Sequence, residues 1–216
     1  MKKLHILWIG LALTLMMPDL NASEQGQVNQ AARVITDFKA LPEKRIPRAV
    51  MRDAEGLAIL TVLKGGFVFS GKVGEGVVVA RTRDGWTGPS FIRTGGAGFG
   101  AQIGGEVTEF VLVLNTPNAV RAFSHGGNVQ LGGALSVAAG PVGRTAAADV
   151  MPKAAIYTYS RSQGLFAGAS LEGTVLVTNK GANADYYGRR VSAEDILSGQ
   201  VAPPKGAHVL LNKLGR

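Results

Sequence analysis

Histidine is the side chain that most often serves as a metal ligand or a proton carrier, and here it is scarce. Beyond the N-terminal run, His125 and His208 remain, and neither has a carboxylate or a second histidine at ligand spacing. The three protein ligands of a catalytic zinc site therefore cannot be assembled around them. His125 precedes Gly126 and is better interpreted as a last-turn residue beside a helix C-terminus.

Motifs for nucleophilic or acid–base catalysis are equally scarce. A serine hydrolase would show G-x-S-x-G, whereas Gly168, Ser170 and Gly173 have one residue too many. Glu106 and Glu109 are the closest thing to a catalytic carboxylate pair, but an extended strand would point them to opposite faces. The chain therefore lacks a nucleophile with a base at a recognisable spacing, and we expect no enzyme activity.

The glycine-rich segments match phosphate-binding loops only in part. Gly98, Gly100 and Gly104 give G-x-G-x-x-x-G, and a strand-like run follows where a nucleotide-binding loop would continue into a helix. No G-x-x-x-x-G-K-[ST] occurs, and the absence of cysteine excludes disulfides, thiolate zinc sites and cysteine nucleophiles. We expect no cofactor and no metal.

Basic side chains are the remaining candidates for function. The chain carries 23 Lys plus Arg against 15 Asp plus Glu, a formal charge of +8, which favours an anionic partner. For any one of these residues a solvated surface side chain is the simpler interpretation, but Arg144 and Arg161 lie in segments otherwise small and apolar. Few aromatic residues are present to stack bases, so nucleic acid is not the expected partner. The candidate anion-binding residues are Lys64, Lys72, Arg81, Arg93, Arg144 and Arg161.

Short runs rich in Val, Ile, Leu and Phe, bounded by glycine, predict that strands position these side chains. Thirty glycines beside so many strands indicate bends and close backbone approaches. The fold class predicted is α+β, predominantly β, with a compact Gly-rich antiparallel sandwich or barrel-like sheet and a few peripheral helices. Strands are expected at 57–63, 66–70, 76–81, 90–94, 101–107, 109–115, 128–138, 154–160 and, in two pieces, 164–178.

Residues 27–41 have apolar side chains at the i, i+3, i+4, i+7 spacing of an amphipathic helix. One interpretation packs this stripe on the core; the other lays it on a bilayer, inserting Ile35 and Phe38 with help from Trp86. Thr116 before Pro117 predicts a helix start, and Ser192 with Asp195 resembles a capping box.

The first 22 residues read as a signal peptide. Lys2 and Lys3 precede an apolar run from Leu4 to Met17, and Ala22 offers a cleavage site. We therefore expect an exported protein, periplasmic or secreted and peripherally bound to a membrane. The expected organisation is a signal peptide at 1–22, an amphipathic helix at 23–46 and one domain at 47–216.

Five segments carry a resemblance to a known family: GVVVARTRDGWTGPSFI (76–92), GAGFGAQIGGEVTEFVLVLNTPNAVRAF (96–123), GGALSVAAGPVGR (132–144), YSRSQGLFAGASLEG (159–173) and YYG (186–188). Over residues 47–201 the chain resembles the SYLF domain family. That resemblance implies non-catalytic binding of anionic phospholipids, with phosphoinositides the ligands of eukaryotic members. In a bacterial envelope another anionic lipid would replace them, and actin is an unlikely partner there.

The expected mechanism is that charge attracts the protein to a membrane and apolar insertion retains it. Each Lys or Arg near an anionic leaflet contributes about 1 kcal/mol, so three to five cations alone give only about millimolar binding. Three alternatives remain open. The chain could be an envelope structural or carrier protein holding a lipid, a factor binding a protein or acidic glycan, or an enzyme acting on lipid.

Overall fold

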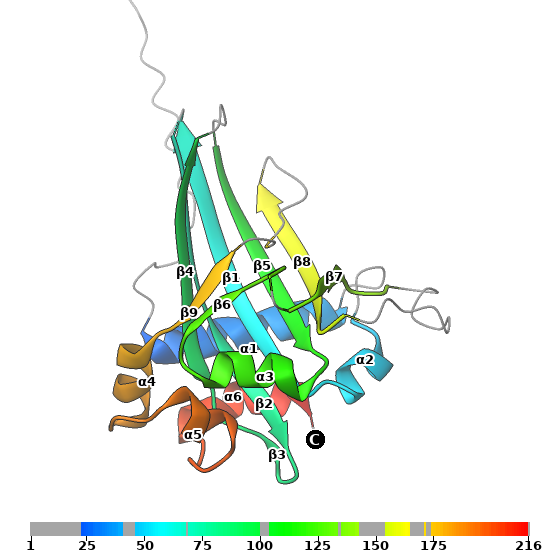
Figure 1. The fold of residues 1–216 in the computed structure, drawn as a ribbon, viewed down its shortest axis with the longest axis vertical. Helices are drawn as coiled ribbons and strands as arrows, with labels where there is room; N and C mark the ends of the chain where they lie inside the picture. The colour runs from blue at the N-terminus through cyan, green and yellow to red at the C-terminus, as the bar shows by residue number, and fades with distance from the viewer. Residues whose placement is uncertain are drawn as a thin grey trace, which may run out of the picture.

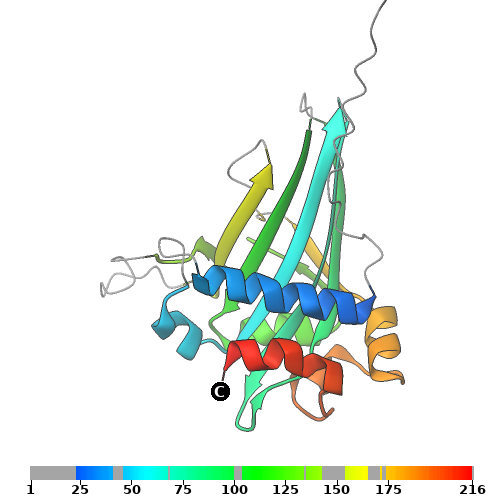
Figure 2. The same ribbon diagram turned by 180° about the vertical axis from the view of Figure 1, so that it is seen from behind.

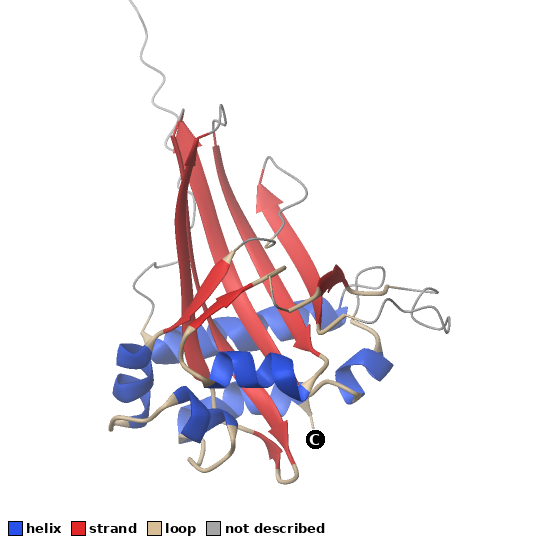
Figure 3. Cartoon of the chain, in the orientation of Figure 1, coloured by secondary structure: helices blue, strands red, loops and turns tan. Residues whose placement is uncertain are grey.

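The computed structural model describes residues 23–40, 46–67, 69–99, 104–133, 135–142, 154–164, 171 and 174–215. Within these ranges nine strands pair into a single curled sheet, and helices pack near one end of it (Figure 1). Figure 3 shows long strands extending beyond the layer of helices. The predicted α+β class is confirmed, with a barrel-like curl and not a sandwich of two sheets.

The described helices and strands have the following bounds. The helices are α1 (Glu24–Ala40), α2 (Arg48–Arg52), α3 (Pro117–Ser124), α4 (Lys180–Tyr187), α5 (Ala193–Leu197) and α6 (His208–Leu214), which follows a 3₁₀ turn at Lys205–Ala207. The strands are β1 (Gly56–Phe67), β2 (Phe69–Thr82), β3 (Gly85–Trp86), β4 (Ser90–Phe99), β5 (Gly104–Leu114), β6 (Asn128–Gln130), β7 (Val137–Ala139), β8 (Ile156–Gly164) and β9 (Val175–Thr178).

The sheet has the order β6-β9-β4-β2-β1-β5-β8-β7, and β3 pairs with the end of β2. Its centre is the β1–β2 hairpin, whose register runs from Gly56 opposite Ala80 to Phe67 opposite Phe69. The pairs are antiparallel except β7 with β8, which is parallel. The sheet therefore brings residues far apart in the sequence onto the same rows.

Both faces of the sheet are covered, which explains why β1 reads as an unbroken apolar run. Leu57 and Ile59 pack in the cluster that includes α1 and α6, whereas Ala58 and Leu60 pack with α3, α5 and β6. Figures 1 and 2 show α1 and α6 on one face and α3 and α5 on the other. Since a fully buried Leu contributes about 2 kcal/mol, these two clusters hold the fold together.

Gly76 marks the tightest approach between the two central strands. A Cβ on this residue would lie 2.1 Å from the carbonyl oxygen of Ile59 and 2.6 Å from Cα of Leu60, its partner across the sheet. Backbone atoms cannot yield as a flexible side chain can, so the position requires glycine. The glycine-rich pattern that predicted close approaches between strands is borne out here.

Candidate functional site

Helix α1 lies across the strands and is fixed to them by an ion-pair network (Figure 2). The guanidinium of Arg161 on β8 donates to the carboxylate of Glu109 on β5 and, at 2.6 Å, to Asp37 of α1. Gln30, also on α1, donates to the second carboxylate oxygen of Glu109 at 3.1 Å. The network therefore holds the C-terminal half of α1 in one position on the sheet.

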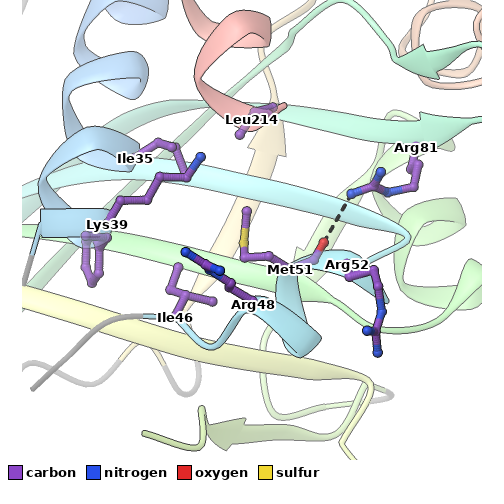
Figure 4. A pocket seen from close by; sticks show the side chains of 9 residues that line it. Ile35, Lys39, Ile46, Arg48, Met51, Arg52, Arg81 and Leu214 are labelled. Carbon is purple, nitrogen blue, oxygen red and sulfur yellow. Dashed lines mark hydrogen bonds between the residues drawn. The ribbon is translucent and has the colours of Figure 1, made fainter. Parts of the chain in front are cut away.

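A cavity of about 500 Å³ opens beside that half of α1, between α1, α2 and α6 (Figure 4). We call it the cationic cavity. It has the size of an ordinary small-molecule site. Its apolar lining consists of Ile35, Phe38, Ile46, Met51 and Leu214, and its charged lining of Lys39, Arg48, Arg52 and Arg81.

The four cations are held in different ways. Arg81 donates to the carbonyl oxygens of Ala54 and Met51, both at 3.1 Å, and its guanidinium lies 4.3 Å from the ring centroid of Trp86. Arg81 therefore fixes the segment that follows α2, because its guanidinium donates hydrogen bonds to two carbonyl groups at or just beyond the end of that helix. Figure 4 shows the Arg81–Met51 hydrogen bond at the edge of the cavity.

The other three cations are more available. Arg48 is exposed and forms no hydrogen bond or ion pair within the described residues, whereas Lys39 donates to the carbonyl oxygen of Lys213. Arg52 pairs with Asp53 at 2.8 Å, and the hydrogen bond from Arg52 lowers the pKa of that carboxyl. Since Asp53 does not line the cavity, the described residues of the lining carry positive charge and no carboxylate.

This arrangement is suited to binding a ligand. Among the described residues no group of three or more His, Cys, Asp or Glu could hold a metal ion. Every described residue of the cavity lining is apolar or cationic, and none of them is a Ser, Thr, His, Asp or Glu. An anionic ligand with an apolar part would match both halves of the lining.

The structure does not bring the six predicted anion-binding residues together. Lys64 and Lys72 face each other across β1 and β2, and Nζ of Lys72 donates to Thr174 at 3.0 Å. Arg93 is exposed on β4 opposite Glu75, and Arg161 belongs to the α1 network. Because side chains alternate along a strand, Lys64 and Lys72 lie on the face opposite Arg93 and Arg161. Of the six, Arg81 alone lines the cationic cavity, and Arg144 lies outside the described residues.

The three residues predicted to insert into a membrane are buried in the protein. Ile35 and Phe38 are each 1% exposed and Trp86 is 9% exposed, all within the cluster between α1 and the sheet. The structure thus shows α1 packed on the core, and in this arrangement the three side chains do not face a bilayer. The structure gives no support to their insertion role.

Sequence reasoning missed the cations that line the cavity from the helices. Arg48 and Arg52 are four residues apart, at the i, i+4 spacing that places two side chains on one side of a helix. That spacing was the available signal. The sequence alone does not show that Lys39 lies near these two arginines, because its position depends on how α1 packs on α6.

Comparisons with known proteins place this architecture among characterised relatives. The family model described as "Ysc84: Las17-binding protein actin regulator" matches residues 95–216. An SH3 domain-containing protein of Schizosaccharomyces pombe is 46% identical over 205 residues, covering 90% of this chain and 48% of its own. LAS seventeen-binding protein 3 of Saccharomyces cerevisiae is 43% identical, covering 89% of this chain and 44% of its own.

A human relative, SH3 domain-containing YSC84-like protein 1, is also 43% identical, covering 86% of this chain and 57% of its own. The chain thus spans about half the length of the curated relatives it matches. The family resemblance inferred from the five motifs is confirmed. The family description names binding and regulation and no reaction.

The predicted location is wrong. The relatives named above are proteins of yeasts and human and not of bacteria, which contradicts the expectation of an exported bacterial protein with a signal peptide, periplasmic or secreted. The argument against actin as a partner fails together with the predicted location, because that argument assumed a bacterial envelope. No helix in the described part of the chain has the length and apolar character to cross a bilayer.

Proposed function

This chain belongs to the Ysc84/SYLF family, and from that premise we propose that it is a non-catalytic module that binds a protein partner. The observation that carries the proposal is the similarity itself. It covers 90% of the chain at 46% identity, and the family model is described as a Las17-binding protein and actin regulator. A binding role also agrees with the apolar and cationic side chains of the described cavity lining.

The test is direct binding to purified Las17 of Saccharomyces cerevisiae. The full chain is immobilised and Las17 is titrated over it, and a saturable curve is expected. A heat-unfolded sample of the chain is the control for non-specific capture. If the folded chain and the unfolded sample retain Las17 equally, the proposal is wrong for this partner.

A second candidate function is the binding of an anionic phospholipid. The observation that favours it is the cationic cavity, where Lys39 and Arg48 lie beside Met51, an apolar lining residue that is only half-buried. Each cation near an anionic headgroup contributes about 1 kcal/mol, and buried acyl carbons add about 25 cal/mol per Å². Charge alone would give weak binding, so the apolar lining has to supply the rest.

Co-sedimentation with vesicles tests this second candidate. Vesicles containing phosphatidic acid should retain the chain better than vesicles of phosphatidylcholine alone, and rising salt should weaken the binding. The double variant Arg48→Gln/Lys39→Gln should lose most of the binding. Arg83→Gln is the matched control, because Arg83 is an exposed arginine outside the cavity lining. Equal loss in the control would show a general charge effect and not a site.

A further inference from the structure

A second cavity, of about 630 Å³, lies where the end of α3, the start of α4 and the segment leading into α5 meet. We call it the α3–α4–α5 cavity. It shares no lining residue with the cationic cavity. Its helices α3 and α5 pack on the sheet face opposite α1 and α6 (Figures 1 and 2). A ligand bound in the cationic cavity therefore does not account for the α3–α4–α5 cavity.

Local sequence signals determine where the helices around this cavity begin and end. Gly126 ends α3 with a left-handed φ of +65°, which glycine adopts without strain. Asn179 caps α4 by accepting from the amide of Ala182, and Ser192 starts α5 with a capping box. Three chain segments thus converge with well-defined ends, which gives the cavity a fixed shape.

The floor of the cavity is small and largely apolar. Side chains this small let the backbone of a bound peptide approach closely. Ser124, His125, Thr178 and Ser192 also line the cavity and bring polar groups that a bound peptide has to hydrogen-bond. No Phe, Tyr or Trp is among the described lining residues, and the imidazole of His125 is the one aromatic ring there. The small residues of the lining are Gly126, Gly181, Ala184, Val191 and Ala193.

The charges around this floor are mainly positive. Lys180 and Arg190 line the cavity, both are exposed, and neither forms an ion pair or a hydrogen bond within the described residues. Glu194 is the one carboxylate of the described lining. The first turn of α4 has no acidic residue to offset the positive end of the helix dipole. The lining therefore offers two unpaired cations to an anionic group.

We propose that the α3–α4–α5 cavity docks an acidic peptide segment of a protein partner. Aspartate or glutamate carboxylates of that segment pair with Lys180 and Arg190, and its small apolar side chains fill the floor. Charge complementarity selects the occupant, and the cavity volume fits a few residues and not a whole helix. The inference rests on the proposed function, a module that binds a protein partner, and locates one contact of that binding.

Fluorescence polarisation tests the proposal with a labelled peptide of alternating glutamate and leucine and the full chain. The double variant Lys180→Gln/Arg190→Gln should weaken binding about tenfold, the effect of losing two partly exposed ion pairs. Arg189→Gln is the matched control, because Arg189 is exposed next to Arg190 but outside the lining. The control variant should bind as the original chain does.

A second variant blocks the floor without touching charge. A Cβ on Gly181 would meet only the side-chain oxygen of Asn179, at an ordinary 3.6 Å. Gly181→Leu should therefore fold, with a melting temperature no lower than the original, since leucine is a better helix former than glycine. Its bulk should fill the cavity and abolish peptide binding.

Four outcomes overturn the proposal. The first two are that the peptide does not bind the original chain, or that it binds both variants with unchanged affinity. The other two are that a peptide with glutamine in place of glutamate binds equally well, or that the variants lose binding to vesicles and keep binding to the peptide. Las17 separates this inference from the proposed function. If Las17 binds the chain and the double variant equally well, the cavity assignment fails and the proposed function stands. If Las17 does not bind but the acidic peptide does, with the expected losses in both variants, the cavity assignment stands.

Discussion

Arg161 on β8 and Asp37 on α1 form an ion pair at 2.6 Å, which joins residues 124 positions apart in the sequence. The same guanidinium reaches Glu109 on the adjacent strand, so one side chain connects a helix to two strands. Asp37 is 44% exposed whereas Glu109 is only 8% exposed. The two contacts of Arg161 should therefore differ in energetic importance.

Removing Arg161 should destabilise the fold far more than removing Asp37. Arg161→Met leaves the carboxylate of Glu109 buried without its cation, which costs about 2 kcal/mol of unfolding free energy. Asp37→Asn removes a half-exposed ion pair and should cost about 0.5 kcal/mol. Urea unfolding measures both. Arg52→Gln, at a fully exposed ion pair, is the control and should show no measurable change.

Glu75 and Glu109 lie on one row of the sheet, and neutralising each carboxylate should affect the stability of the fold differently. Burial raises the pKa of Glu75, repulsion from Glu24 raises it further, and Arg93 opposes both. A raised folded-state pKa means that stability is lost as the pH rises above the ordinary glutamate value. At pH 7 Glu75→Gln should therefore leave stability unchanged or higher, whereas Glu109→Gln should lower it. Thermal unfolding of both variants decides the matter, and equal losses would contradict it.

Local signals predicted the starts of α3 and α5 correctly because capping involves only neighbouring residues. The hydroxyl of Thr116 accepts from the amide of Ala119 at 3.1 Å, and Ser192 and Asp195 form the expected reciprocal capping box. Helix α4 was missed although its ends carry the same kind of signal, with Asn179 before it and a left-handed Gly188 after it.

The strands were harder to delimit, since partners distant in the sequence decide where a strand ends. Residues 128–138 were expected to form one strand, but β6 stops at Gln130, Gly132 turns with φ +80°, and β7 begins at Val137 on the opposite edge of the sheet. Residues 101–107 and 109–115 were separated, although within the described residues 104–114 form the single strand β5.

The cationic cavity could not be predicted from the sequence for a related reason. Lys39, Arg48 and Arg81 meet only because α1 and α2 pack beside the end of β2. In contrast, Lys64 and Arg93 were grouped by charge and then separated by the alternation of strand side chains. Charge composition indicated an anionic partner, but only the register of the sheet tells which cations share a face.

Gly76 should tolerate no larger side chain, whereas a glycine five residues earlier in the same strand should. Gly76→Ala would push a methyl group against the carbonyl oxygen of Ile59 and should cost about 3 kcal/mol or prevent folding. Gly71→Ala is the matched control, because nothing lies within 4 Å of a Cβ there. Urea unfolding compares the two variants. Equal stability would mean that the strands can separate at Gly76 without cost.

Alkaline pH should destabilise the protein through one buried tyrosine, Tyr159, and two half-buried ones, Tyr186 and Tyr187. Burial raises the pKa of Tyr186 from 10.0 to about 12, and it raises the pKa values of Tyr187 and Tyr159 further. Because the folded state holds these protons more tightly than the unfolded state, stability is fully present below pH 10 and declines between about pH 10 and 12. Thermal unfolding across this range, with tyrosinate absorbance followed in parallel, measures the decline.

Tyr186→Phe isolates one contribution to that alkaline loss. The ring of Tyr186 packs edge-on against Phe91 with centroids 5.1 Å apart, and phenylalanine preserves this contact. Its hydroxyl makes only a long hydrogen bond, 3.4 Å to the side-chain oxygen of Gln25, so the variant should fold normally at neutral pH. Between about pH 10 and 12 the variant should lose less stability than the original chain, because one ionisable group is gone. Identical alkaline curves would show that Tyr186 ionises without opening the packing between α4 and β4.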